Sequence, residues 1–295
     1  MPQTNLVFGQ VESDLKNKKY SSAMMKLGSI SVKYSKDIVF LNYLAKTQKA
    51  LSDVSGLIRT LKEIIKIDST PGCQLELMKI LYAEGSINDA LDIGLSLQDE
   101  QLAPREVKIL SHLLLKIFIE ENDFDGVQET VAKFQNSADE DDFMQWAMGL
   151  VSLSRNDKNG ALTFFRAAVA SNNKNDQAWV SLAMLHDEMG DRELAMANLE
   201  MSLDRNPLNQ AAVKLYSAWA PKNAEKIGTA LSRIQFYLSK NEFDEEISLC
   251  HIQLLSKIQS WKNVDFEISK LILTQPQNSN YREMKKKLEL SLDIN

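Results

Sequence analysis

The sequence predicts an all-α protein, a right-handed superhelical solenoid of about eight antiparallel helix pairs that ends in a capping helix. Three observations support this prediction. The chain has 295 residues with only 11 glycines and 6 prolines, whereas a β-sandwich or barrel needs a turn every ~8–12 residues. Apolar residues recur every three or four positions, as they do on one face of a helix. A period of about 34 residues runs through the chain, and such a period is typical of stacked helix pairs.

Two neighbouring segments, residues 142–175 and 176–209, align without a gap. Each is expected to form two helices separated by a short turn, Asn156-Asp157 in the first segment and Gly190-Asp191 in the second. Small residues on both helices would let the backbones approach closely, and a bulky residue would fill the space beside them. The aligned residues are Gly149 with Ala183, Ala161 with Ala195, and Phe165 with Leu199.

The second segment resembles a tetratricopeptide repeat (TPR). The residues that carry the resemblance are Trp179, Leu182, Ala183, Gly190-Asp191, Ala195, Leu199 and Pro207. His186 departs from the pattern, because it stands where that family usually has Tyr. The resemblance implies a solenoid in which the first helix of each pair lines the concave side.

The small residue of the second helix can be followed back towards the N-terminus in steps of 34, 37, 33 and 34 residues. The step of 37 has a visible cause, a longer polar loop at residues 98–104. The positions are Ala161, Val127, Ala90, Leu57 and Ala23. We therefore predict TPR-like repeats over residues 1–277, strongest at 142–209, followed by a capping helix at 278–295, since solenoids need a polar cap for solubility.

The repeat is degenerate over residues 210–244. Thr229 and Arg233 stand there in the slots where Ala and Leu are expected. The next apolar segment, residues 247–258, either belongs to a new pair or forms the second helix of a pair that begins near Ala224. The pattern leaves both alternatives open.

Charge and composition restrict the classes of partner. The formal net charge is -6, and the middle third, residues 101–200, carries 9 basic and 17 acidic side chains. An acidic surface repels phosphates, so we expect no nucleic-acid binding. The most apolar stretch, residues 109–119, is too short and polar to cross a bilayer. With two cysteines, Cys73 and Cys250, and no basic segment at the N-terminus, we expect a cytoplasmic protein without membrane insertion.

The sequence contains no recognisable catalytic or cofactor-binding motif. None of the three histidines, His112, His186 and His251, has the spacing of a metal site or a catalytic dyad, and His186 is expected in the core. The acidic run at 139–142 lacks the spacing of a calcium loop and suits a helix N-terminus instead. We therefore expect no enzyme activity, no cofactor and no metal.

The resemblance implies a non-enzymatic scaffold or adaptor that binds a segment of a partner protein in the concave groove. The alternative is a peptide-sensing regulatory TPR protein, although such regulators usually carry an N-terminal effector domain, whereas the repeats here begin almost at once. TPR proteins that grip a terminal carboxylate use a Lys followed four residues later by an Asn. Lys214 is followed by Ala218, so we expect no need for a partner's C-terminal carboxylate. The oligomeric state is not indicated.

Positions four apart on the first helices share a face, which in TPR proteins looks into the concavity. Three successive repeats present a lysine there, and the next two present an apolar patch. The candidate partner-binding residues are Asn42, Lys46, Lys79, His112, Lys116, Trp146, Leu150, Val180 and Met184. This surface predicts a partner segment that is both acidic and hydrophobic.

Three alternatives to this groove remain open. The lysines are either a recognition surface or ordinary solvated side chains. Trp146 is either a groove residue or a core tryptophan displaced by one position. The convex face is a further surface on which a partner could bind.

Overall fold

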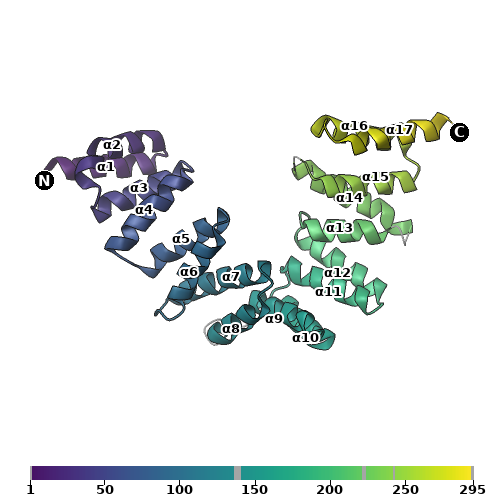
Figure 1. The fold of residues 1–295 in the computed structure, drawn as a ribbon, viewed down its shortest axis with the longest axis horizontal. Coiled ribbons are helices and arrows are strands. Elements are labelled where there is room, and N and C mark those ends of the chain that lie inside the picture. Colours follow the sequence, from purple (N-terminus) through teal and green to yellow (C-terminus); the bar gives the residue numbers. More distant parts are fainter. Residues whose placement is uncertain (1, 136–140, 221–223, 242, 294–295) are drawn as a thin grey trace. The chain divides into compact units, whose positions relative to one another are not determined.

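The computed structural model describes residues 2–135, 141–220, 224–241 and 243–293. Over these ranges the chain forms 17 α-helices and no strand (Figure 1). This confirms the predicted fold class, with eight helix pairs and one final helix. The chain divides into two compact units, residues 1–139 and 140–295. The repeat pattern does not mark this division, because the sequence was expected to form one run of repeats over 1–277.

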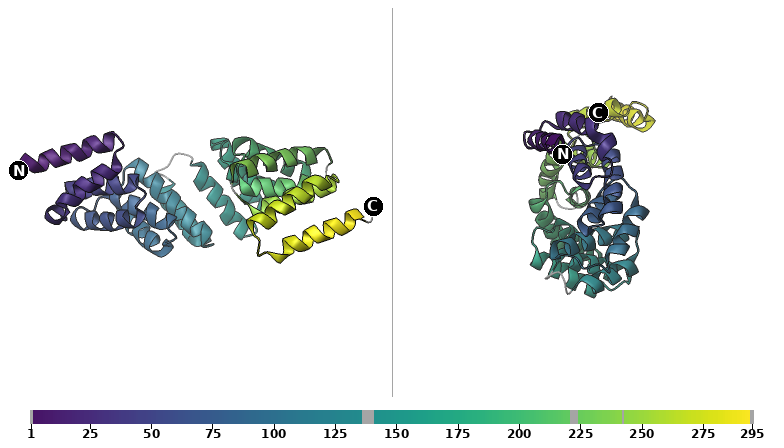
Figure 2. Two further views of the ribbon diagram at one scale, coloured as in Figure 1. Left: turned by 90° about the horizontal axis from the view of Figure 1, so that it is seen from above. Right: turned by 90° about the vertical axis from the view of Figure 1, so that its left-hand side faces the viewer.

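Unit 1 contains the first four pairs, in which the two helices of each pair pack together and the second helix of each of the first three pairs packs against the next pair (Figures 1 and 2). The first helices of successive pairs also touch, α1 with α3 and α5 with α7. The helices are α1 (Pro2–Lys16), α2 (Tyr20–Tyr34), α3 (Ile38–Ala50), α4 (Val54–Ile67), α5 (Pro71–Ala83), α6 (Ile87–Leu97), α7 (Pro104–Glu120) and α8 (Phe124–Phe134).

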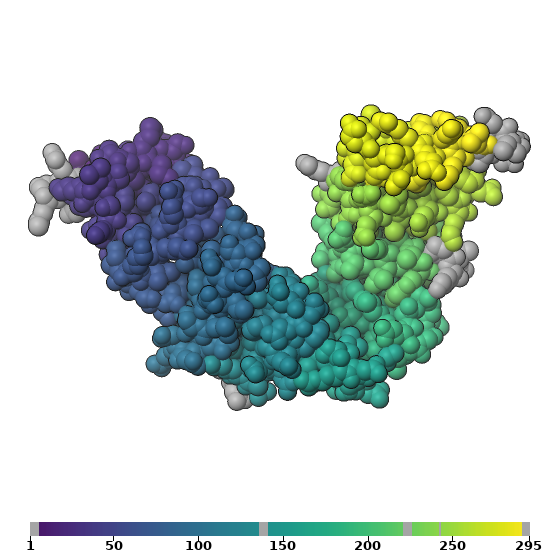
Figure 3. Space-filling model, viewed as in Figure 1, coloured from purple at the N-terminus to yellow at the C-terminus, as the bar shows by residue number. Residues whose placement is uncertain are grey.

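Unit 2 contains four further pairs and the final helix, again packed in chain order. Its helices are α9 (Asp142–Ser154), α10 (Lys158–Ser171), α11 (Asp176–Glu188), α12 (Arg192–Arg205), α13 (Gln210–Trp219), α14 (Ala224–Lys240), α15 (Glu245–Lys257), α16 (Trp261–Thr274) and α17 (Ser279–Asp293). Within each unit the surface colours follow the sequence in order (Figure 3), because each pair covers mainly its neighbours.

The small residues predicted for the second helices lie in the core. Ala23, Ala90, Val127, Ala161 and Ala195 are all fully buried. In the α9–α10 pair there is no room for a side chain at Gly149, because an added Cβ would lie only 2.2 Å from the Phe165 ring. The close approach of the two helices therefore depends on the small residue on the first helix and the ring on the second, as the alignment predicted.

A single left-handed residue reverses the chain between the two helices of most pairs. Gly85 and Gly190 have φ values of 77° and 84°, and non-glycine residues take the same place in other pairs. These are Lys18, Ser52, Asn122, Asn156 and Gln259, with φ between 57° and 59°. In four pairs the next residue is an aspartate that caps the second helix by accepting a backbone N–H three residues on: Asp53, Asp123, Asp157 and Asp191.

A polar seam joins successive pairs in unit 2. Asp142, the first residue of α9, accepts hydrogen bonds from Asn172 (3.1 Å) and Asn175 (2.8 Å), which precede α11. One repeat later, Asp176 accepts equivalent bonds from Asn206 (2.9 Å) and Asn209 (2.6 Å). The recurring Asp and Asn of this period therefore fix the spacing between pairs, while the apolar residues fix the spacing within them.

The degenerate region forms an ordinary pair, α13 with α14, but its register differs by one residue from the sequence expectation. The buried residues in the Ala and Leu slots are Ala230 and Ile234 rather than Thr229 and Arg233. Since α15 pairs with α16, residues 247–258 belong to the first helix of a new pair, which settles the alternative left open above.

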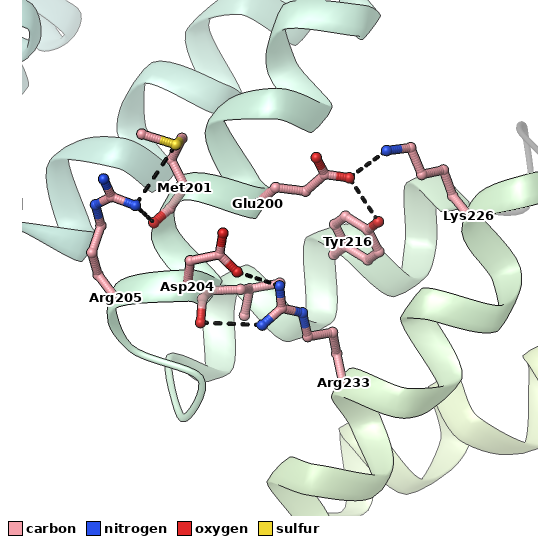
Figure 4. A network of polar contacts seen from close by, with 8 residues as sticks. Glu200, Met201, Asp204, Arg205, Tyr216, Lys226 and Arg233 are labelled. Atoms are coloured by element: carbon pink, nitrogen blue, oxygen red, sulfur yellow. Dashed lines mark hydrogen bonds and ion pairs between the residues drawn. The ribbon is translucent and has the colours of Figure 1, made fainter.

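Polar side chains at this point connect α12 to the degenerate pair (Figure 4). The Tyr216 hydroxyl on α13 donates to Glu200 on α12 over 3.0 Å, and Lys226 on α14 donates to the same carboxylate. Arg233, displaced from the core slot, donates to Asp204 instead. Burial raises the pKa of Tyr216, so its hydroxyl remains a donor at neutral pH.

Candidate functional site

The candidate residues of unit 1 lie on three first helices. Asn42 and Lys46 are on α3, Lys79 is on α5, and His112 and Lys116 are on α7. The structure brings two of them together, Lys79 and His112, in a hollow of about 330 Å³. We call this hollow the α5–α7 groove. It is lined by Lys79, Arg105, Lys108, Ile109, His112 and Leu113.

Arg105 and Lys108 were missed from the sequence because they lie in the first two turns of α7, before His112 and Lys116, the positions from which the candidate face was taken. The helix begins at Pro104, and its N-terminus is fixed by Glu106, whose carboxylate accepts the Ala103 backbone N–H over 2.9 Å. A proline at the first helical position followed by a glutamate two residues later is a start signal that could have revealed this turn. The first two turns of α7 place Arg105 and Lys108 in the same groove lining as Lys79.

Basic side chains dominate the groove. Neither Lys79 nor Arg105 makes an ion pair within the described residues, whereas the neighbouring Lys49 is paired with Glu76. Ile109 and Leu113 supply the apolar part of the lining. The groove therefore combines positive charge with apolar surface.

The other three candidates of unit 1 do not line this groove. Asn42 is exposed, and its side-chain amide donates to the Ile38 carbonyl of its own helix over 2.9 Å. The Lys46 ammonium lies 5.9 Å from the centre of the Tyr43 ring. Lys116 is an exposed residue two turns further along α7 than Lys108. These residues are on the same first helices but do not converge on one site.

Trp146, in unit 2, joins two first helices. It is half-buried, its indole N–H donates to the Ser181 hydroxyl on α11 over 2.9 Å, and its ring lies 5.2 Å from that of Phe143. Trp146 packs against the buried cluster around Phe165 and keeps part of its surface exposed. Its polar atom is already used inside the protein.

The remaining apolar candidates differ in exposure. Val180 is only 7% exposed and belongs to the core of unit 2, so it offers a partner almost no surface. Leu150 is half-buried, and Met184 is 50% exposed. Met184 is therefore the candidate in unit 2 with the most accessible apolar surface.

Lys214, the residue considered for a carboxylate clamp, already has a carboxylate partner. Its ammonium lies 2.8 Å from both oxygens of Glu246 on α15. The hydrogen bond to Glu246 raises the pKa of Lys214, so the lysine stays charged. A partner's C-terminal carboxylate would have to compete with this internal one.

The titratable core residues suit a structural role. His251 is buried, neither ring nitrogen has a hydrogen-bond partner among the described residues, and Nδ1 is 3.6 Å from Glu267. Burial lowers the pKa of His251 and of His186, which favours the neutral imidazole in both. Burial also raises the pKa of the Cys250 thiol, which disfavours the nucleophilic thiolate.

The acidic run at 139–142 does not form a metal site in the part that the structure describes. Asp141 caps α9 by accepting the backbone N–H groups of Phe143 (3.0 Å) and Met144 (3.1 Å), and Asp142 belongs to the polar seam. Asp139 and Glu140 lie outside the described residues. Over the described ranges, no three His, Cys, Asp or Glu side chains are grouped to hold a metal ion.

Comparison with known proteins shows the fold without a close relative. No family model and no curated protein matches the chain. Among solved structures, it is similar to a tetratricopeptide repeat protein from Parabacteroides merdae, with a TM-score of 0.57 and 12% identity over 85% of this chain and 98% of that one. It is also similar to one chain of the Cut9–Hcn1 hetero-tetramer structure of the APC/C, with a TM-score of 0.56 and 12% identity over 83% of this chain.

The match to the Cut9–Hcn1 structure covers 48% of that chain, so this chain spans about half its length. At such low identity the likeness concerns the fold alone. The protein has the TPR fold, as the resemblance of residues 176–209 implied. Separately, none of the described helices is long and apolar enough to cross a membrane.

Proposed function

We propose that this protein is a non-enzymatic interaction scaffold, and that unit 1 binds an acidic and hydrophobic segment of a partner protein in the α5–α7 groove. The observation that supports the proposal is the convergence of Lys79, Arg105 and Lys108 around Ile109 and Leu113. We place the protein in the cytoplasm, and we expect its partner to be a protein rather than a nucleic acid.

Charge and apolar surface have different roles in such a groove. Basic side chains at the rim speed the encounter with an acidic segment and align it, but they add little net affinity because their charges are screened by salt. The apolar side chains Ile109 and Leu113 exclude water from a bulky anchor residue, and such anchors supply most of the affinity of short segments. The partner segment therefore needs carboxylates beside at least one large apolar side chain.

Unit 2 provides a second contact of a different kind. Met184 presents exposed apolar surface on α11, three residues after Ser181, the hydrogen-bond partner of Trp146. Methionine is flexible and polarisable, which suits a surface that adapts to an apolar partner. In this proposal Met184 contributes the exposed anchor surface, while Trp146 supports it through its bond to Ser181.

The test is to place a photo-crosslinking amino acid at Leu113 in the full chain, capture the partner in the native cell, and synthesise the crosslinked segment. Lys79→Glu combined with Arg105→Glu should then slow its association by about tenfold at low ionic strength and by less in high salt. The matched control, Lys174→Glu with Lys257→Glu, changes two exposed lysines of unit 2 and should leave association unchanged.

The same titration also tests unit 2. Met184→Ala should weaken binding of the full-length partner by about tenfold. It should not cause the loss of packing that Trp146→Ala would cause. Amidation of the partner's C-terminus should have no effect, because Lys214 is held by Glu246. A crosslinked segment without acidic residues, or unchanged association in the Lys79/Arg105 variant, would remove the basis for the proposal.

A further inference from the structure

Unit 1 has a second hollow that shares no lining residue with the α5–α7 groove. It has a volume of about 630 Å³ and lies among α4, α5 and α6. We call it the α4–α6 hollow. It is lined by Arg59, Lys62, Glu63, Ile65, Lys66, Gln74, Leu77 and Ile93.

The rim of this hollow is basic. Arg59 and Lys62 are exposed and make no ion pair within the described residues. Lys66 is paired with Glu63 over 2.6 Å, a contact between exposed side chains three residues apart that salt and solvent weaken. Two cations therefore remain without a counter-charge beside an apolar floor of Ile65, Leu77 and Ile93.

The repeat itself does not require these basic residues. They stand two, five and nine positions after Leu57, the residue that occupies the small-residue slot of α4. After Ala90 of α6 the same positions hold Asp92, Leu95 and, just beyond the helix, Asp99, and in α12 they hold Ala197, Glu200 and Asp204. In α10 the position five after Ala161 holds Arg166, but the other two positions hold Thr163 and Ala170. The combination of three basic residues at these positions therefore distinguishes α4 from α6, α10 and α12.

We infer that the α4–α6 hollow is a second protein-binding site, and that it takes a short acidic segment with one bulky apolar side chain. The apolar side chain enters the floor, and its flanking carboxylates pair with Arg59 and Lys62. A volume of about 630 Å³ is within the range of pockets that enclose a small ligand or an anchor residue. The phosphates of a nucleic acid could pair with the basic rim, but a nucleic acid has no aliphatic side chain to fill the Ile and Leu lining. The hollow therefore favours a peptide.

Binding at the α4–α6 hollow does not require binding at the α5–α7 groove. Two separate basic sites on one unit would allow the scaffold to hold two acidic segments at once. If both segments belong to one partner, the second binding event is intramolecular, and the affinity for that partner exceeds the affinity of either site alone.

The test uses methyl NMR of the full chain with isoleucine and leucine methyl labels. The probe is a synthetic ten-residue peptide of alternating Glu-Glu and Leu-Leu pairs, with two matched peptides in which Gln replaces Glu or Ser replaces Leu. The first peptide should shift the Ile65, Leu77 and Ile93 methyl signals at concentrations up to about 1 mM, and the two matched peptides should not. Arg59→Glu with Lys62→Glu should weaken this response by about tenfold.

The groove variant, Lys79→Glu with Arg105→Glu, separates the two sites. It should leave the shifts of Ile65 and Ile93 intact while abolishing those of Ile109. The inference is overturned if the first peptide leaves the hollow's methyl signals unchanged, if the Gln peptide binds equally well, or if only a single-stranded DNA oligonucleotide shifts them. Circular dichroism of each variant checks that these substitutions leave the fold intact.

Discussion

At the scale of single residues, the fold depends on small side chains at the contact between paired helices. Ala195 is fully buried where α12 meets α11, and Leu199 fills the space one turn further on. A core packed to this density has no room for three extra carbon atoms, so an enlarged side chain must displace its neighbours.

We therefore expect Ala195→Leu to lower the free energy of unfolding by ~1–3 kcal/mol. The matched control is Ala197→Leu, which makes the same change on the same helix at an exposed position. Denaturant unfolding followed by circular dichroism measures both. Equal midpoints for Ala195→Leu and wild type would contradict the repeat register itself.

The sequence predicted some residues of the candidate site and missed others. Lys79 and His112 were found because they occupy the periodic face of a first helix. Arg105 was missed because it lies in the first turn of α7, before the positions from which the candidate face was taken. Val180 was assigned to the groove by position alone, yet it is 7% exposed, because periodicity gives the direction of a side chain but not how deeply the next helix covers it.

At the scale of elements, the recurring feature is the turn between the paired helices. Its left-handed residue is a glycine at Gly85 and Gly190, and a residue with a side chain at Lys18, Ser52 and Gln259. A Cβ in this conformation crowds the following carbonyl, at a cost of roughly 1–2 kcal/mol for residues other than Gly, Asn or Asp.

Gly190→Ala should therefore destabilise the protein by about 1 kcal/mol, although no atom would contact the added Cβ. The reverse change, Gln259→Gly, should be neutral or stabilising by up to about 1 kcal/mol, because relief of strain is partly offset by the greater freedom of glycine in the unfolded chain. Differential scanning calorimetry of the two variants gives the comparison. If Gly190→Ala stabilised the protein and Gln259→Gly destabilised it, the turn would not be strained.

The helix elements themselves were predictable wherever the small residues recur at full strength. The exception was α13–α14, where Thr229 and Arg233 were assigned to core slots. The buried residues are Ala230 and Ile234, one position later. A step of one residue on a helix turns the side chain by about 100°, from 3.6 residues per turn. A single additional residue before α14 is thus enough to defeat a register extrapolated from the neighbouring repeat.

At the scale of the whole molecule, the repeat period predicted the order of the helices but not the division at residues 139 and 140. In a solenoid each pair is stabilised by its neighbours. The repeat pattern of a pair is the same whether the following pair packs against it over a large or a small area. The final helix differs, because it has a neighbour on one side only. In α17 the buried side chains Tyr281 and Leu288 pack against Ile268 and Leu271 of α16.

Removal of this final helix should expose the apolar face of α16. A chain that ends after Pro276 would lose the Tyr281 hydroxyl bonds to Glu245 and Gln275 and the Lys285 bond to Ser269 of 2.8 Å. It would also leave Ile268 and Leu271 without cover. We expect this chain to self-associate, because solenoid ends without a polar cap are poorly soluble, and to lose hydrogen-exchange protection in α15 and α16.

Light scattering after size-exclusion chromatography measures the self-association, and hydrogen exchange locates the loss. Protection in α3–α8 should stay as in wild type, since the residues packed around Tyr281 and Leu288 all belong to unit 2. The control is Leu290→Ser, which changes an exposed residue of the same helix and should alter neither measurement. A truncated chain with the mass and the α16 protection of wild type would show that α17 is an appendage and that α16 itself ends the solenoid.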